Sequence, residues 1–275
     1  MASETSTSLA RAIGILSVLG SREHSGEGGI GVVRVASLLG REKSQVSRTL
    51  KELAAAGFVH RDPDTSRYRL GWRLFALAAG AGDQQLLTLA PAVLRRLVTR
   101  VGESAHLTVL EGSEVLTVMS ENPGRLIQAA SWIGRATPLH CTSAGRALLF
   151  DHPDDQVQAL LDDIPMPQSG PRAPRTVEEV LVRLHDARRR GYVLIDEEFE
   201  QGHVAVAAPV RDFRGRTVAA LNISAPKYRL GRTLRMAGGE VQAAANELTR
   251  LLTSPSVVHA PEPAPAAAGT TRRFS

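Results

Sequence analysis

Lys43-Ser44-Gln45-Val46-Ser47-Arg48-Thr49-Leu50-Lys51 is the stretch that decides the fold of the first part of this chain. Val46 and Leu50 are one helical turn apart, so they predict the inner side of a helix over 43–56, ended by Gly57. The residues around them are polar or basic and lie near the start of that helix. A helix that enters the major groove of DNA needs short polar and basic side chains at that end.

The segments around this helix predict a compact helical unit that is followed by a hairpin. Apolar spacing predicts helices over 8–19 and 33–39, with a tight turn at Gly40-Arg41-Glu42. Two strand-like runs, 58–61 and 67–70, flank Asp62-Pro63-Asp64-Thr65-Ser66, whose residues favour a turn. Helix, helix, turn, helix and hairpin is the element order of a winged helix-turn-helix domain.

The basic residues are concentrated in this same region. The whole chain has 33 basic and 28 acidic residues, but segment 41–73 alone has eight basic against four acidic. Residues 1–40 balance at three each, and the part from Leu74 onward has 22 against 21. Localised basic charge is the footprint of a polyanion binder. RNA is disfavoured because the segment offers no aromatic platform for stacking bases.

We therefore expect contacts with double-stranded DNA, and an ordinary surface helix with a surface hairpin is the alternative. Gln45 suits an adenine edge, and Arg48 suits a guanine edge or a phosphate. The flexible ammonium groups of Lys43 and Lys51 suit phosphates. The full set of candidate DNA contacts is Lys43, Ser44, Gln45, Arg48, Thr49 and Lys51 in the helix, and Arg61, Arg67 and Arg69 in the hairpin.

The remainder of the chain predicts an α+β domain with a mainly antiparallel sheet. Helices over 72–79 and 84–101 are expected to link the two domains. Strands are expected over 106–110, 114–120, 126–131, 192–196, 204–212 and 217–224, and helices over 142–150, 153–162, 176–190 and 232–252. The expected units are a DNA-binding domain (1–73), a helical linker (74–101), a second domain (102–253) and a disordered, Pro/Ala-rich tail (254–275).

Composition limits the possible classes of protein. The single cysteine, Cys141, cannot form an internal disulfide or a cysteine zinc cage, so a reducing cytoplasm is expected. No secretory signal and no apolar window near eighteen residues is present, so no membrane span is expected. The eight histidines lack the paired spacing of a zinc site, and we expect neither a metal nor another cofactor.

Several motifs resemble those of IclR-type bacterial transcriptional regulators, from about Leu9 to Leu252. In the first half they are Leu9-Ala10-Arg11-Ala12-Ile13-Gly14-Ile15-Leu16, the segment 43–50, Gly57-Phe58-Val59 and the segment 61–71. In the second half they are Gly134-Arg135-Ala136-Thr137-Pro138-Leu139-His140-Cys141-Thr142-Ser143-Ala144-Gly145-Arg146-Ala147-Leu148-Leu149, Arg188-Arg189-Arg190-Gly191-Tyr192, Asp196-Glu197-Glu198, Gly202, Ala207-Ala208-Pro209-Val210-Arg211-Asp212 and Gly215.

The resemblance implies a winged helix-turn-helix domain that is joined by a helix to a GAF-like effector-binding domain. It also implies a homodimer or homotetramer on a near-palindromic operator, with a small organic acid, often a metabolite of aromatic degradation or central carbon metabolism, as effector. The family's ligand pocket includes positions matching Leu126, Ser143, Ala144, Asp196, His203, Ala205, Asn222 and Ser224.

Departures from the family pattern leave the ligand open. Many relatives have cysteine at Ala205 and serine at Asn222, some have an aliphatic residue at His203, and lysine is usual at Arg146. Trp132 is either an aromatic wall of the pocket or core filler.

Two local features allow more than one interpretation. Thr142 and Ser143 open a helix, where their hydroxyls either help to hold a polar ligand or only cap the helix. Asp196-Glu197-Glu198 is expected to be a charged strand end, with Asp196 as a possible ligand contact, because adjacent strand residues point to opposite faces.

Two alternatives to a ligand-responsive regulator are a ligand-blind oligomeric DNA-binding protein and an enzyme acting on small organic acids. An enzyme would use Cys141, His140 or Asp196, but no GxSxG, HExxH or phosphate-loop motif supports catalysis.

Overall fold

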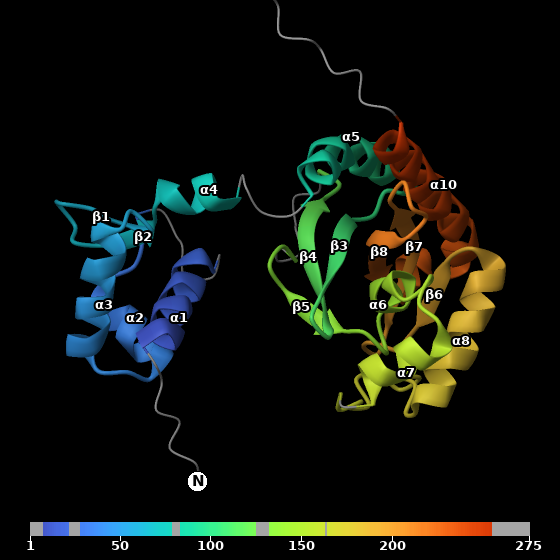
Figure 1. The fold of residues 1–275 in the computed structure, drawn as a ribbon, viewed down its shortest axis with the longest axis horizontal. Helices are drawn as coiled ribbons and strands as arrows, with labels where there is room; N and C mark the ends of the chain where they lie inside the picture. Colours follow the sequence, from blue (N-terminus) through green and yellow to red (C-terminus); the bar gives the residue numbers. More distant parts are fainter. Residues whose placement is uncertain (1–7, 22–27, 79–82, 125–131, 163, 255–275) are drawn as a thin grey trace, which may run out of the picture.

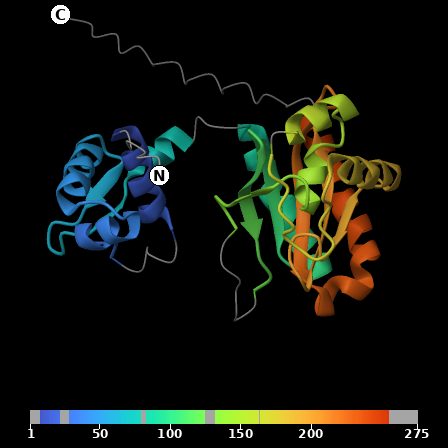
Figure 2. The same cartoon turned by 90° about the horizontal axis from the view of Figure 1, so that it is seen from below.

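The computed structural model describes residues 8–21, 28–78, 83–124, 132–162 and 164–254. Two groups of elements are evident in both views (Figures 1 and 2), one running from α1 to α4 and the other from α5 to α10. Each group has its own buried core. The expected strand over 126–131, with Leu126, lies outside the described residues, as does the tail from residue 255.

The first group is a helix-turn-helix unit with a two-stranded hairpin, as predicted. Its elements are α1 (Ser8–Gly20), α2 (Val32–Leu39), α3 (Lys43–Ala55), β1 (Val59–Arg61), β2 (Tyr68–Leu70) and α4 (Trp72–Ala78). Gly40 ends α2 in the left-handed conformation (φ 59°), which turns the chain sharply into α3. Ile15, Val35, Val46, Leu50 and Tyr68 are buried together and hold α3 against the other elements.

The second group is a six-stranded sheet with helices on both faces. Its helices are α5 (Gln84–Val101), α6 (Ser143–Leu148), α7 (Asp154–Leu161), α8 (Val177–Arg190), α9 (Lys227–Leu230) and α10 (Leu234–Thr253). Its strands are β3 (Ala105–Glu111), β4 (Glu114–Glu121), β5 (Ala136–Pro138), β6 (Val193–Asp196), β7 (His203–Arg211) and β8 (Thr217–Pro226). The order is β5-β4-β3-β8-β7-β6, and all neighbours are antiparallel.

The alternation of side chains along the strands assigns one core to each face of the sheet. On β3 and β8, Leu107, Leu221 and Ile223 pack against α5 and α10, which lie side by side (Figure 1). On the opposite face, Val115 and Ile195 belong to the core beneath α6, α7 and α8. The residues between the apolar ones on β3 and β8 therefore also face α6.

Two elements of the second group differ from the sequence-based prediction. β5 was not predicted, because three residues are too few for a periodic pattern. The last helix was expected from Arg232, but α10 begins at Leu234 after the short α9 and one 3₁₀ turn, Gly231–Thr233. Both differences concern short elements, for which periodicity carries little information.

Candidate functional site

The outer side of α3 presents most of the predicted DNA contacts. Lys43, Ser44, Arg48 and Lys51 are exposed, and Gln45 is half-buried. Thr49 differs from the expectation of a groove-facing side chain. It is 6% exposed, and its hydroxyl donates to the Gln45 carbonyl at 3.2 Å. Its spacing from Val46 already places it on the buried side of the helix, so Thr49 is corrected from a base-contacting residue to a core residue.

The hairpin holds its three arginines at the surface on an ordered turn. Arg61, Arg67 and Arg69 are all exposed. One oxygen of Asp62 accepts hydrogen bonds from the backbone of Asp64 and from both the backbone and hydroxyl of Thr65, at 2.8–3.1 Å. These bonds, first of all the one from the Thr65 backbone, lower the pKa of Asp62. Arg61 donates to the Ser66 hydroxyl at 2.7 Å, which orients its guanidinium beside the turn.

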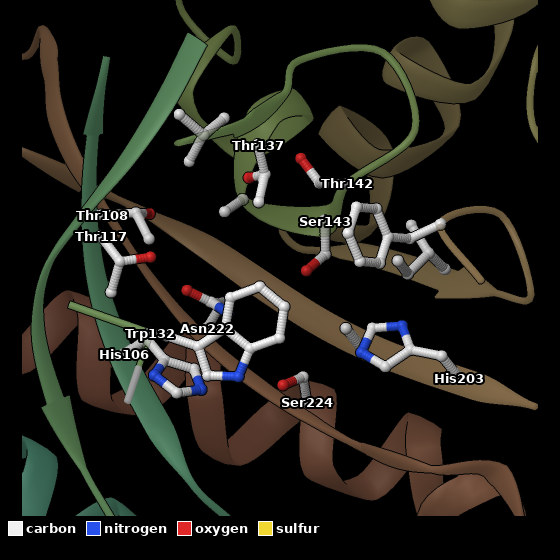
Figure 3. A pocket seen from close by; sticks show the side chains of 15 residues that line it. His106, Thr108, Thr117, Trp132, Thr137, Thr142, Ser143, His203, Asn222 and Ser224 are labelled. Carbon is white, nitrogen blue, oxygen red and sulfur yellow. The ribbon is translucent and has the colours of Figure 1, made fainter. Parts of the chain in front are cut away.

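A cavity of about 450 Å³, including its open mouth, lies between the sheet and the start of α6 (Figure 3). Its described lining residues come from β3, β4, β5, β6, β7, β8, α6 and three connecting segments. They are His106, Thr108, Val115, Thr117, Trp132, Thr137, Thr142, Ser143, Ala144, Ile195, Phe199, His203, Ala205, Asn222 and Ser224. A concave site with apolar and aromatic walls and a few polar groups is typical of small-molecule binding sites.

The polar floor of this cavity follows from strand pairing. His106 lies directly opposite Asn222 in the β3–β8 register. Ala205 lies opposite Ser224 in the β7–β8 register. Residues that face each other across antiparallel strands project to the same face of the sheet, so both pairs meet beneath α6.

Four rings follow one another around the cavity. The ring centroids of Trp132 lie 6.3 Å from those of both His106 and Phe199, and Phe199 lies 5.7 Å from His203. All three contacts are edge-on, a favourable arrangement for aromatic rings. Trp132 therefore forms part of the cavity wall.

The cavity has no fixed charge among its described lining residues, which include no Lys, Arg, Asp or Glu. Burial lowers the pKa of His106 to about 4, and burial also lowers the pKa of His203. Both imidazoles are therefore neutral near pH 7. An uncharged histidine offers one hydrogen-bond donor and one acceptor.

Most residues predicted for the pocket come together here. Trp132, Thr142, Ser143, Ala144, His203, Ala205, Asn222 and Ser224 all line the cavity. Asp196 does not, because it follows the lining residue Ile195 and its carboxylate is bound by Arg172 at 2.5 Å and Lys227 at 2.8 Å. Leu126 lies outside the described residues.

Sequence reasoning did not place several lining residues: Thr108, Val115, Thr117, Thr137, Ile195 and Phe199. The signal for two of them was the alternation of polar and apolar residues on β3 and β4. Thr108 and Thr117 are buried polar residues at alternating strand positions, which is typical of a polar cavity wall. Nothing in the local sequence marks Phe199, since it lies in the segment between β6 and β7.

Thr142 has a structural role at the start of α6. Its hydroxyl oxygen accepts from the Gly145 backbone at 3.1 Å and donates to the Pro138 carbonyl at 2.6 Å. The capping interpretation therefore holds for Thr142. Ser143 lies next to it, and its hydroxyl points into the cavity (Figure 3).

Each acidic residue of the run 196–198 is paired with a cation, and Asp196 and Glu197 share Lys227. Asp196 is bound as described above, and Glu197 is bound by Lys227 at 2.9 Å. Glu198 is buried and lies 2.8 Å from Arg146 and 2.7 Å from Arg183. Glu198 is therefore not an exposed charge. In the described part of the chain, no three His, Cys, Asp or Glu side chains group together as a metal site.

Both halves of the chain match family models. "Bacterial transcriptional regulator IclR C-terminal" matches residues 79–250, and "IclR helix-turn-helix domain" matches residues 8–63. The chain belongs to the IclR family of transcriptional regulators. It is a regulator with an N-terminal helix-turn-helix domain and a C-terminal effector domain.

Similar IclR-family proteins cover most of the chain. XynR of Escherichia coli, an HTH-type transcriptional regulator, is 31% identical over 195 residues, 70% of this chain and 77% of its own length. The repressor AllR of Escherichia coli is 28% identical over 88% of both chains. An IclR homologue from Microbacterium hydrocarbonoxydans, solved in complex with 4-hydroxybenzoate, aligns with TM-score 0.75 at 25% identity, covering 90% of this chain and 100% of the other.

The described helices place no segment across a membrane, since none of them combines the necessary length and apolar character.

Proposed function

We propose that this protein binds a near-palindromic operator as a homodimer or homotetramer in the cytoplasm, and that a small organic acid or related metabolite in the cavity controls this binding. Residues 1–73 would contact DNA, residues 74–101 would link the domains, and residues 102–253 would bind the ligand. The observation that carries the proposal is the cavity itself, with neutral polar groups and aromatic walls, in a chain whose excess of basic over acidic residues lies in segment 41–73, which includes α3 and the hairpin.

In the DNA complex, Lys43, Ser44, Gln45, Arg48 and Lys51 would lie in or beside the major groove. The hairpin arginines would contact the backbone or the minor groove. In the cavity, the proposed ligand contacts are Trp132, Ser143, Ala144, His203, Ala205, Asn222 and Ser224. The relative solved with 4-hydroxybenzoate supports an aromatic acid as one class to test.

Ligand binding would act through a shift of populations between two arrangements of the assembly. A ligand that prefers one arrangement changes the spacing of the two recognition helices, and with it the operator affinity.

We propose that the protein is a regulator without enzymatic activity. Burial raises the pKa of Cys141, which is the opposite of the change that activates a thiol. Asp196 is held by two cations outside the cavity, and the buried His140 contacts the Pro167 carbonyl at 3.3 Å. A turnover that is lost in Cys141→Ala would revive the enzymatic alternative.

A mobility-shift assay on DNA surrounding the protein's own promoter tests the proposal. We expect a specific complex whose affinity changes when a ligand found by thermal-shift screening of aromatic and aliphatic acids is added. Ser143→Trp, which fills the cavity, should keep the DNA complex and lose the response to ligand. Absence of specific binding would contradict the DNA-binding proposal. A complex that no ligand of any class alters would favour the ligand-blind alternative.

A further inference from the structure

Among the described residues, three polar atoms on cavity-lining side chains have no hydrogen-bond partner. One is Nδ1 of His203. The other two are Nε2 of His106 and Oδ1 of Asn222, on residues that are 3% and 9% exposed. A buried polar atom without a partner costs free energy, so such atoms are rare in folded proteins. His106 and Asn222 lie opposite each other on β3 and β8. Their two unpaired atoms thus belong to adjacent side chains on one wall.

Other hydrogen bonds restrict what these two groups can offer. Nδ1 of His106 is 2.9 Å from the Ser120 hydroxyl, so only Nε2 remains for a ligand. The hydroxyl of Thr108, next on the same strand face, donates to the Ala220 carbonyl at 3.2 Å. Oδ1 of Asn222 is an acceptor and needs a donor. Nε2 of a neutral imidazole donates or accepts, depending on the tautomer that Ser120 selects.

The groups beside this polar pair favour an aromatic ring. Trp132 lies 6.3 Å from His106, centroid to centroid, and Phe199 continues the wall on its other side. Edge-on and offset contacts of this kind stabilise a bound ring beyond the burial of its apolar area. A ring is also rigid, so binding it costs little conformational entropy.

The described lining of the cavity offers no charge that would favour a ligand that depends on its carboxylate. The described lining has no cation, and both imidazoles are neutral near pH 7. The hollow outside the mouth contains Arg229, but its guanidinium already binds the Glu103 carboxylate at 2.7 and 2.9 Å. An anion that is removed from water without an opposite charge or sufficient hydrogen bonds pays a large desolvation cost.

We propose that the effector is a hydroxylated aromatic compound, whose ring packs against Trp132 and Phe199 and whose hydroxyl bridges Asn222 Oδ1 and His106 Nε2. A hydroxyl donates and accepts at once, so it satisfies both atoms. A carboxylate only accepts and would leave Asn222 Oδ1 without a donor. The ring hydroxyl is therefore the group that is recognised, and a carboxylate elsewhere on the ring is dispensable. This inference rests on the proposed role of the cavity as the effector site.

Isothermal titration calorimetry of the full chain tests it with four probes: phenol, 4-hydroxybenzoate, benzoate and cyclohexanol. We expect phenol and 4-hydroxybenzoate to bind. Benzoate, which lacks the hydroxyl, should bind at least about tenfold more weakly than 4-hydroxybenzoate. Cyclohexanol, which lacks the aromatic ring, should bind more weakly than phenol. A tenfold change corresponds to one hydrogen bond of about 1.4 kcal/mol. Benzoate binding as tightly as 4-hydroxybenzoate would overturn the inference.

The variant Asn222→Leu removes the amide at nearly constant volume. The affinity for phenol and for 4-hydroxybenzoate should fall about tenfold, and the affinity for benzoate should not change. The two acids should then bind this variant with similar affinity. Asn246→Leu, the same change at an exposed position on α10, is the matched control. It should keep the wild-type ratio of the affinities for 4-hydroxybenzoate and benzoate. His106→Phe keeps a ring and removes both nitrogens, so it provides a second variant if Asn222→Leu does not fold. An unchanged ratio in a folded variant would overturn the inference.

The outcomes separate this inference from the proposed function. Failure of all four probes, or binding of only non-hydroxylated ligands in the wider thermal-shift screen, would overturn the ligand class while the regulatory proposal stands. A protein that binds its operator and responds to no ligand would contradict the effector role itself.

Discussion

At the scale of single residues, the cavity depends on polar side chains at strand positions that are normally apolar. His106 is the clearest case, since it lies on a central strand and is 3% exposed. Removing an imidazolium from water is costly, so burial, with a smaller contribution from the nearby His203, lowers the pKa of His106 from 6.5 to about 4. The side chain remains neutral, which suits a hydrogen-bonding role and does not suit binding of an anion.

This pKa predicts a pH dependence of stability that His106→Gln should remove. Below pH 6.5 an unfolded histidine takes up a proton, whereas buried His106 does not until about pH 4. Between these two pH values the unfolded state binds more protons than the folded state. The free energy of unfolding therefore falls as the pH drops from 6.5 towards 4, and this residue causes no loss of stability above that range. Between pH 7.5 and pH 5 the loss from this residue should be about 2 kcal/mol.

The measurement is urea unfolding at both pH values, followed by Trp132 fluorescence in a Trp72→Phe background. His106→Gln should reduce the difference between the two pH values by that amount. His60→Gln, at an exposed histidine on β1, controls for the loss of a histidine and should leave the difference intact. If His106→Gln and His60→Gln show the same pH dependence of unfolding, His106 is not the source of the predicted loss of stability.

At the scale of elements, α6 is fixed by close backbone contact with the segment that precedes it and by a buried ion pair to the segment that follows β6. A Cβ on Gly145 would lie 2.3 Å from the Leu139 carbonyl oxygen, so only glycine permits this approach. Arg146, 1% exposed, lies 2.8 Å from Glu198, which precedes the cavity residue Phe199. The pair thus connects the helix that carries Ser143 to the segment that carries Phe199.

Glu198→Gln should therefore lower the free energy of unfolding by about 3 kcal/mol, because it leaves the Arg146 guanidinium buried without an opposite charge. The exposed pair Arg100–Glu240 provides the comparison, and Glu240→Gln should cost less than about 1 kcal/mol. Urea unfolding at pH 7.5 measures both. If the two substitutions cost the same, the buried pair does not stabilise α6 in the way described.

At the scale of the whole molecule, the charge is divided unequally between the two parts. Segment 41–73 has eight basic and four acidic residues, whereas the part from Leu74 onward is nearly balanced. The exposed cations of α3 and the hairpin are thus available to phosphates. The described part of the second domain instead pairs many of its arginines with carboxylates.

This division predicts how operator binding responds to salt. Arg48→Ala should weaken specific binding by about 1–3 kcal/mol if Arg48 contacts a base. Lys51→Ala should weaken specific and nonspecific DNA alike, and should lower the slope of log affinity against log salt by about one. Fluorescence anisotropy at several salt concentrations measures both effects. Arg189→Ala, an exposed position on α8, should change neither, and salt-insensitive binding would contradict phosphate contacts by α3.

From the sequence alone, most helices and strands followed from local periodicity, glycine positions and turn residues. The recognition helix was predicted because Val46 and Leu50 define its buried side without reference to any other element. Thr49 was misassigned although its spacing from Val46 places it on that buried side. The pattern itself failed at β5 and at the start of α10, where the elements are too short to show a period.

Only the tertiary structure decided which residues form the cavity. His106 and Asn222 are 116 positions apart, and their meeting depends on the register between β3 and β8, which no local pattern encodes. Phe199 and Trp132 reach the same cavity from connecting segments, and Asp196 is directed away from it to Arg172 and Lys227. Elements form from interactions close in sequence, whereas a binding site is assembled by strand pairing and packing between residues far apart in the chain.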